Sequence, residues 1–279
     1  MGMKVYGLRL GTFSVDIEHL MWDHPKYMLL PGSGEKKKVW YQCPAMAYVV
    51  EHPQGRILFE TGVSPQWREE WPEEWKALAG WDEIKPGDFL EAKLKSVGLG
   101  PEDFRYVVMG HMHIDHAGGL RLFEDADVDI LIHEDEYRGV AQLEESAAAV
   151  SLADFAILPR KRPTLVYGDE EIMEGVRLLS LPGHTWGTMG MLVQLAHTGA
   201  IMFTTDALYH HEAYGPPPVG SGVTMFPDKW QRSMEKVYRY AQTHEALVVP
   251  GHDDVAVKQL PGGKSKMVEL AYGPESAYE

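Results

Sequence analysis

Three imidazoles and one carboxylate lie within six consecutive positions of the segment Gly110-His111-Met112-His113-Ile114-Asp115-His116-Ala117-Gly118-Gly119. The segment follows Tyr106–Met109, an apolar run typical of a short buried strand. His111 and His113 are two positions apart in an extended stretch, so both side chains can point to one side. Imidazole and carboxylate are ligands that zinc and related metals prefer. The segment therefore predicts a metal site at the end of a strand.

Three more candidate ligands follow predicted strands elsewhere in the chain. His184 comes after Val176–Leu181, Asp206 after Ile201–Phe203, and His252 after Ala246–Val249. Strands aligned in one sheet would bring these ends to one edge, where rigid elements hold functional side chains in place. Four ligands from the first segment alone would leave a single metal no open position, so two metals sharing the whole set fit better.

The remaining pattern predicts many short strands with a few helices between them. Sheets packed on each other with helices outside are expected, which is an α+β architecture in one domain of residues 1–279. The other strands expected are Lys4–Leu10, Ala45–Glu51, Arg56–Glu60, Val128–His133 and Met189–Leu195, and the clearest helices are Asp135–Glu145 and Lys229–Thr243.

Two segments do not fit this pattern. Residues 19–43 have no apolar period and are predicted to form a long loop, a feature that is often functional. In residues 64–87, Trp67, Trp71 and Trp75 recur every four positions, which predicts a helix with an aromatic face. That face could line a substrate groove, pack in the core, or bury against a second subunit in a homodimer.

Composition excludes several classes of protein. The formal net charge of −15 argues against a nucleic-acid surface, which needs clustered Lys and Arg. No apolar run reaches the roughly 18 residues of a membrane span, so no membrane partner is expected. The first residues lack the apolar stretch and cleavage site of a signal peptide. The single cysteine, Cys43, cannot form an intramolecular disulfide, and together these features favour a cytoplasmic protein.

On these motifs the chain resembles the metallo-β-lactamase superfamily. The resemblance rests on His111-Met112-His113-Ile114-Asp115-His116 and continues through His184, Asp206 and His252. It implies an αβ/βα sandwich of two mostly antiparallel or mixed sheets flanked by helices. It also implies two divalent metal ions, the first held by His111, His113 and His184, the second by Asp115, His116 and His252, with Asp206 as the bridge. Zinc is the default metal, although the same ligands suit cobalt, iron or manganese.

Within the superfamily, the chain is most similar to quorum-quenching N-acyl-homoserine lactone lactonases. The segment Asp206-Ala207-Leu208-Tyr209 has the Asp-x-x-Tyr spacing of that branch. The implied activity is hydrolysis of a small-molecule lactone by a bridging hydroxide. In that reaction Tyr209 donates a hydrogen bond to the developing oxyanion, and Asp115 passes a proton to the leaving alkoxide.

Other readings remain open at this point. Lactonases for γ-butyrolactone or 4-pyridoxolactone share much of the pattern, and a thioesterase-like hydrolase or a non-catalytic metal-dependent lactone-binding protein would also fit. An acyl chain needs an apolar groove, for which residues of the early loop are the candidates: Met21, Trp22, Tyr27 and Met28.

Overall fold

The strands of the protein form two sheets that pack face to face. The computed structural model describes residues 2–22, 39–260 and 264–279. Within them the first sheet has the order β1 to β6 and the second the order β13 to β7. The first comprises β1 (Lys4–Asp16), β2 (Trp40–Glu51), β3 (Arg56–Phe59), β4 (Phe104–Val108), β5 (Asp129–His133) and β6 (Thr164–Val166). The second comprises β7 (Glu170–Met173), β8 (Val176–Ser180), β9 (Met189–Leu195), β10 (Gly199–Phe203), β11 (Leu247–Val249), β12 (Val255–Gln259) and β13 (Ser265–Glu269).

Both sheets are mixed, in different proportions. In the first sheet β1, β2 and β3 are antiparallel neighbours, whereas β3 to β6 run parallel. In the second sheet β10 and β11 are parallel and the other described pairs are antiparallel. The predicted α+β sandwich is therefore confirmed.

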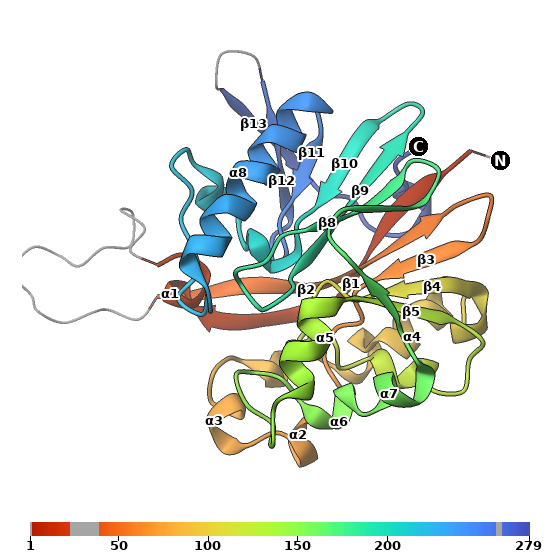
Figure 1. Ribbon diagram of the computed structural model, residues 1–279, viewed down its shortest axis with the longest axis vertical. Helices are drawn as coiled ribbons and strands as arrows, with labels where there is room; N and C mark the ends of the chain where they lie inside the picture. The colour runs from red at the N-terminus through yellow and green to blue at the C-terminus, as the bar shows by residue number, and fades with distance from the viewer. Residues whose placement is uncertain (1, 23–38, 261–263) are drawn as a thin grey trace, which may run out of the picture.

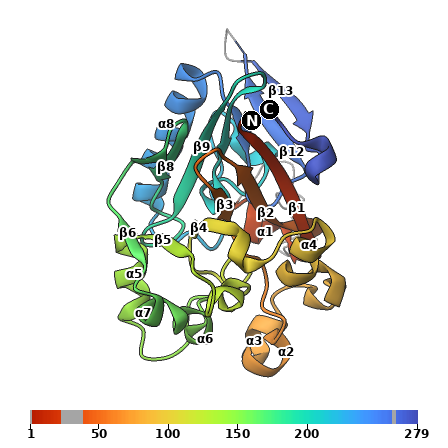
Figure 2. The same ribbon diagram turned by 90° about the vertical axis from the view of Figure 1, so that its right-hand side faces the viewer.

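Alternating side chains of the strands enter two separate interiors. On β4, Val108 faces the layer between the sheets, together with Phe59 and Phe203, while Val107 belongs to the core beneath the helices. Strands buried on both faces read as nearly continuous apolar runs, which is why the sequence shows them as short hydrophobic blocks. The helices lie outside the sheets. Figures 1 and 2 show α8 (Pro227–Thr243) beside the second sheet, and α4 (Leu90–Ser96), α5 (Glu134–Ala141), α6 (Leu152–Phe155) and α7 (Ile157–Lys161) on the side of the first.

The first strand is longer than the sequence predicted. A break in its register between Arg9 and Thr12, with Gly11 at φ +93°, marks a β-bulge, and the strand then continues to Asp16. The short helix α1 (Ile17–Leu20) follows. The long loop predicted at residues 19–43 was wrong at residues 19–20, which end α1, and at residues 40–43, which begin β2; residues 23–38 lie outside the described residues. No helix in the described ranges has both the length and the apolar character needed to cross a bilayer.

The single aromatic helix predicted within residues 64–87 was also wrong. The structure has two short helices there, α2 (Trp67–Glu70) and α3 (Glu73–Lys76), separated by Trp71 and Pro72. A residue before proline avoids the helical region, and Trp71 accordingly adopts ψ 143°. Trp67 and Trp71 are buried within this chain, so their rings are not available to a second subunit.

Candidate metal centre

The predicted ligands meet at one edge of the sandwich. They follow β4 of the first sheet and β8, β10 and β11 of the second, so the expectation of one shared sheet was wrong. Because the two sheets pack face to face, their strand ends still converge. Six of the seven side chains are buried, and Asp115, with its side chain 15% exposed, is the one that reaches the surface of the site.

One group of candidate ligands consists of His111, His113, His184 and Asp206, whose ligand atoms all lie within 4.8 Å of one another. Nε2 of His184 is 2.9 Å from Nδ1 of His113 and 3.4 Å from Oδ2 of Asp206. Nε2 of His111 is 3.6 Å from the same Oδ2. Three imidazoles and one carboxylate oxygen therefore surround one point.

A second group, Asp115, His116 and His252, lies beside the first. Nε2 of His252 is 3.4 Å from Oδ2 of Asp115 and 3.2 Å from Nε2 of His116. Oδ1 of Asp206 is 3.3 Å from Nε2 of His116 and 3.2 Å from Nε2 of His252. The two oxygens of Asp206 thus face different groups, so this carboxylate joins them.

The polar atoms of the site fit divalent cations. Nε2 of His111 and Oδ1 of Asp206 are buried without a hydrogen-bond partner, although buried polar atoms in native proteins are normally satisfied. Two imidazole nitrogens as close as those of His113 and His184 cannot both present lone pairs unless a proton or a metal ion lies between them. Imidazole and carboxylate without thiolate is a donor set that suits zinc and its neighbours.

The electrostatics of the two groups differ. Burial lowers the pKa of His111 and His184 well below its usual value, and that of His113 to about 4, so these imidazoles are neutral and able to bind a metal. Burial opposes protonation of His116 and His252 as well, but the nearby carboxylates, Asp206 foremost, outweigh it and raise the pKa of both. The second group therefore attracts positive charge, which bound cations would supply.

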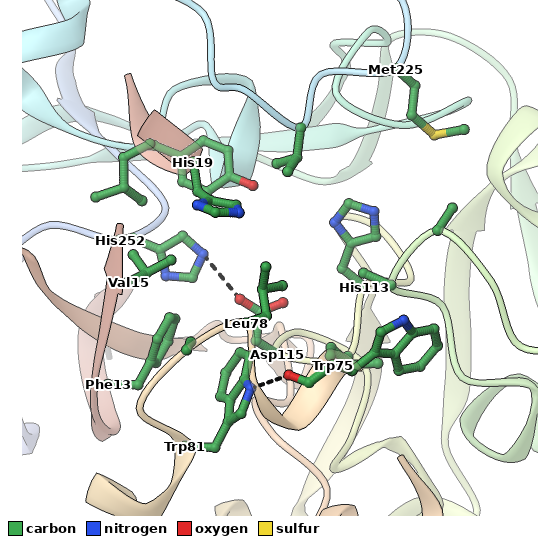
Figure 3. A pocket seen from close by; sticks show the side chains of 17 residues that line it. Phe13, Val15, His19, Trp75, Leu78, Trp81, His113, Asp115, Met225 and His252 are labelled. Atoms are coloured by element: carbon green, nitrogen blue, oxygen red, sulfur yellow. Dashed lines mark hydrogen bonds and ion pairs between the residues drawn. The ribbon is translucent and has the colours of Figure 1, made fainter. Parts of the chain in front are cut away.

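An apolar pocket of about 290 Å³ opens onto the second group and His113. Figure 3 shows Phe13, Val15, Leu78 and Trp81 around His113, Asp115 and His252. Tyr209 also lines the pocket, with its hydroxyl 3.4 Å from Nε2 of His184. Burial, with Asp206 and Asp115 nearby, raises the pKa of Tyr209 well above its usual value, so the phenol stays a hydrogen-bond donor at neutral pH.

Sequence comparison places this geometry in a family. The model of the metallo-beta-lactamase superfamily matches residues 40–252. The chain belongs to this superfamily. Among curated members, it is 28% identical over 266 residues to N-acyl homoserine lactonase AiiB of Agrobacterium fabrum, covering 91% of this chain and 94% of that protein. It is 31% identical over 229 residues to an N-acyl homoserine lactonase of Bacillus cereus, covering 81% and 85%.

Solved structures of the superfamily agree on the fold. An N-acyl homoserine lactone hydrolase, with the product N-hexanoyl-L-homoserine bound at its catalytic metal center, superposes with a TM-score of 0.74. It is 24% identical and covers 91% of this chain and 94% of its own. A dizinc quorum-quenching lactonase, AidC, superposes with a TM-score of 0.69 at 15% identity, covering 97% and 95%.

Of the four residues predicted to line an acyl-chain groove, two lie away from this pocket and two lie outside the described residues. Met21 is buried in the core, and the side chain of Trp22 is exposed beside Pro218 and Gly220. Neither lines the pocket, and Tyr27 and Met28 lie outside the described residues. The apolar walls come from other segments, which the sequence did not single out apart from Trp75: Phe13, Val15, Leu20, Trp75, Leu78, Ala79, Trp81, Ile114, Val223 and Met225.

Glu60 is a site residue that the sequence analysis missed. It is buried at the end of β3, with its Oε1 3.4 Å from Nδ1 of His116, and it accepts a hydrogen bond from the Thr205 hydroxyl at 2.7 Å. A carboxylate on the far nitrogen of a metal-binding imidazole fixes the ring's orientation. Its position at a strand end, like that of the other ligands, was the signal that could have found it.

Proposed function

We propose that this chain is a metal-dependent lactonase that opens the ring of N-acyl-homoserine lactones. The observation that carries the proposal is the pair of histidine–carboxylate groups, joined by Asp206, beside a mainly apolar pocket. A lactone ring with a hydrocarbon tail has the matching chemistry, a polar carbonyl at one end and an apolar chain at the other. The curated relatives named above support the same substrate class.

In this proposal the residues divide into three roles. His111, His113 and His184 would hold a first divalent ion, Asp115, His116 and His252 would hold a second, and Asp206 would be the ligand shared by both. When bound, such ions act as Lewis acids and supply hydroxide at neutral pH. Zinc is the proposed metal, with cobalt, iron and manganese as competitors, because the donor set is imidazole and carboxylate.

Tyr209 and Asp115, the second of which is also a proposed metal ligand, act on the substrate itself. The Tyr209 hydroxyl donates a hydrogen bond to the carbonyl oxygen as negative charge develops on it. Water adds to the carbonyl carbon and gives up a proton to the Asp115 carboxylate, the ring C–O bond breaks, and Asp115 passes that proton to the departing ring oxygen. The product is the open hydroxy acid, and no covalent intermediate with the protein is required. Asp115 suits this role because it lines the pocket and is the most exposed of the ligand candidates.

Three expectations, on domain number, cellular location and assembly, accompany the proposal. Residues 1–279 are proposed to form one domain, and a cytoplasmic location is proposed on the single buried cysteine, Cys43. A homodimer is the expected assembly, which sedimentation of the purified protein would test.

A pH-stat hydrolysis screen with elemental analysis tests the function. The substrates are acyl-homoserine lactones of several chain lengths, γ-butyrolactone, 4-pyridoxolactone, a thioester and a simple ester. We expect acid release to be fastest with acyl-homoserine lactones and to require about two metal ions per chain. Faster opening of γ-butyrolactone or 4-pyridoxolactone would reassign the substrate. Tight lactone binding without acid release would indicate a binding protein instead.

A further inference from the structure

Glu136 is a fully buried carboxylate that belongs to neither ligand group. It lies in the first turn of α5, on the buried face of the helix, with 0% of its surface exposed. Its Oε1 accepts the backbone N–H of Met112 at 2.9 Å, and its Oε2 accepts that of Gly187 at 2.9 Å. Each oxygen thus accepts a backbone N–H, and the Thr185 side chain, next to His184, also hydrogen-bonds to the carboxylate.

The two donors belong to the two loops that carry the first ligand group. Met112 stands between His111 and His113 in the loop after β4, and Gly187 comes three residues after His184 in the loop after β8. Since β4 and β8 lie in different sheets, the carboxylate links two ligand loops across them, alongside the backbone hydrogen bond that the Met189 N–H donates to the Gly110 carbonyl at 2.7 Å.

The close approach of the second loop to α5 supports a built contact. A Cβ atom on Gly187 would lie 2.5 Å from the backbone nitrogen of Glu136, a distance that real Cβ atoms do not adopt. Glycine is therefore needed for the loop to reach the carboxylate. Burial raises the pKa of Glu136, and the hydrogen bonds from the Thr185 side chain and from the backbone of Gly187 and Met112 oppose that rise. Such a costly buried carboxylate is retained only where its hydrogen bonds are made.

We propose that Glu136 is a positioning residue that sets the spacing of His111 and His113 relative to His184, and thereby the affinity of the first metal site. The inference rests on the proposed function only in taking these three histidines as ligands of one ion. The hydrogen bonds of the Glu136 carboxylate do not reach Asp115, His116 or His252, so the second metal site should depend on Glu136 far less. Residues that orient ligands from outside the coordination shell typically change metal affinity by about 10–100-fold.

The test is Glu136→Gln in the zinc-loaded protein, dialysed against a graded chelator and analysed for zinc per chain. The amide keeps the shape but presents one acceptor and one NH₂ group, so one of the two backbone donors loses its acceptor. We expect one ion to leave about 10–100-fold more readily than in the parent protein while the other is retained. Cobalt substitution, followed by its visible absorption, identifies which group of ligands has emptied.

The matched control is Asp135→Asn. Asp135 precedes Glu136 on the same helix and its side chain is exposed, so the substitution removes the same negative charge from the surface. It should lose zinc as the parent does. Thermal unfolding of each metal-free variant separates positioning from a general loss of fold. Unchanged retention of both ions in the Gln variant would overturn the proposal. Loss of both ions, combined with a metal-free Gln variant that no longer unfolds cooperatively, would also overturn it.

Glu136→Asp provides a second variant if the amide does not fold. It keeps the charge but draws the carboxylate back by one methylene, so first-site affinity should fall between those of the parent and the Gln variant. Affinity equal to that of the parent would count against the proposal. None of these measurements uses a lactone. A parent protein that binds two ions but opens no lactone would refute the proposed function and leave this test of Glu136 valid.

Discussion

The ligand edge and the apolar wall face the same pocket, yet they are built in different ways. The ligand edge is formed by strand ends, whose backbones are fixed by the sheets, and its chemistry is carried by imidazoles and carboxylates. The apolar wall is formed by Phe13 and Val15 near the end of β1, and otherwise mainly by short helices and loops: α1, residues 75–81 and residues 223–225. The difference suggests that the reaction depends on the edge, whereas the choice of substrate depends on the wall.

Removing the shared ligand should have the largest effect on the edge. Asp206→Ala deletes both oxygens that join the two groups, so we expect zinc content to fall from about two ions per chain toward zero. Loss of Lewis-acid stabilisation worth several kcal/mol should lower kcat/KM by at least about 10³-fold for every chain length. Elemental analysis and pH-stat rates measure this. Retention of two ions would remove Asp206 from its bridging role.

Tyr209→Phe tests whether chemistry at the edge can be lost without losing metal. The phenol lies beside the first group, and its hydroxyl is proposed to stabilise the oxyanion. Loss of one such donor typically costs about 10²–10³-fold in kcat. We expect that fall with zinc content and KM nearly unchanged, and similar losses for short and long acyl chains. If kcat stayed at the parent value, the role of Tyr209 would be packing against His184 and His252.

The sequence predicted the ligand edge because residue type limits what these positions can do. His111, His184, Asp206 and His252 each follow an apolar strand, and few structural roles require such groups at four strand ends. The sandwich followed from the same strands. Which of the two sheets each ligand-bearing strand joins did not follow, because apolar blocks do not reveal which strands pair across long separations in the chain.

The sequence did not predict the apolar wall, for equally physical reasons. Phe13 and Val15 lie beyond the β-bulge at Gly11, where the strand pattern is interrupted. The spacing of the tryptophans indicated one helix, but Pro72 divides it and sends Trp71 into the core while Trp75 faces the pocket. Glu136 stands beside Glu134 and Asp135, so in sequence it resembles part of a solvated acidic face. Apolar and acidic residues have many roles, and only tertiary packing distinguishes them.

Two buried carboxylates, Asp206 at the ligand edge and Asp154 in α6, have pKa values shifted in opposite directions. This difference gives a test of stability. Burial opposes ionisation of Asp206, but protonated His116 and His252 hold its pKa well below the usual range. Asp154, in α6, has Arg121 as its main positively charged neighbour. The Arg121 Nε is 3.1 Å from Oδ1 of Asp154. Burial there outweighs the guanidinium and raises the pKa of Asp154 from 3.8 to about 6.

The sign of the Asp154 effect follows from that direction. Its pKa is higher in the folded state than in the unfolded state, so its stabilising contribution is complete below pH 3.8 and is lost as pH rises through about 6. Asp154→Asn stays neutral throughout. Between pH 4 and 7.5 the variant should therefore gain about 2 kcal/mol in unfolding free energy relative to the parent. Urea unfolding of both proteins in chelator measures the difference, and parallel pH profiles would show that Asp154 ionises without cost.

Trp75→Ala should give the smallest effect and is the most specific test of the wall. Its ring lines the pocket, whereas its carbonyl accepts the Trp81 indole N–H at 2.7 Å, a backbone contact that alanine preserves. Loss of this apolar surface should cost roughly 1–3 kcal/mol in kcat/KM for long acyl chains, and much less for short ones. Trp22→Ala is the matched control, since that ring is 51% exposed and lines a different groove. A chain-length effect in Trp22→Ala but not in Trp75→Ala would place the acyl chain along the early segment, as the sequence predicted, and would separate the wall from substrate choice.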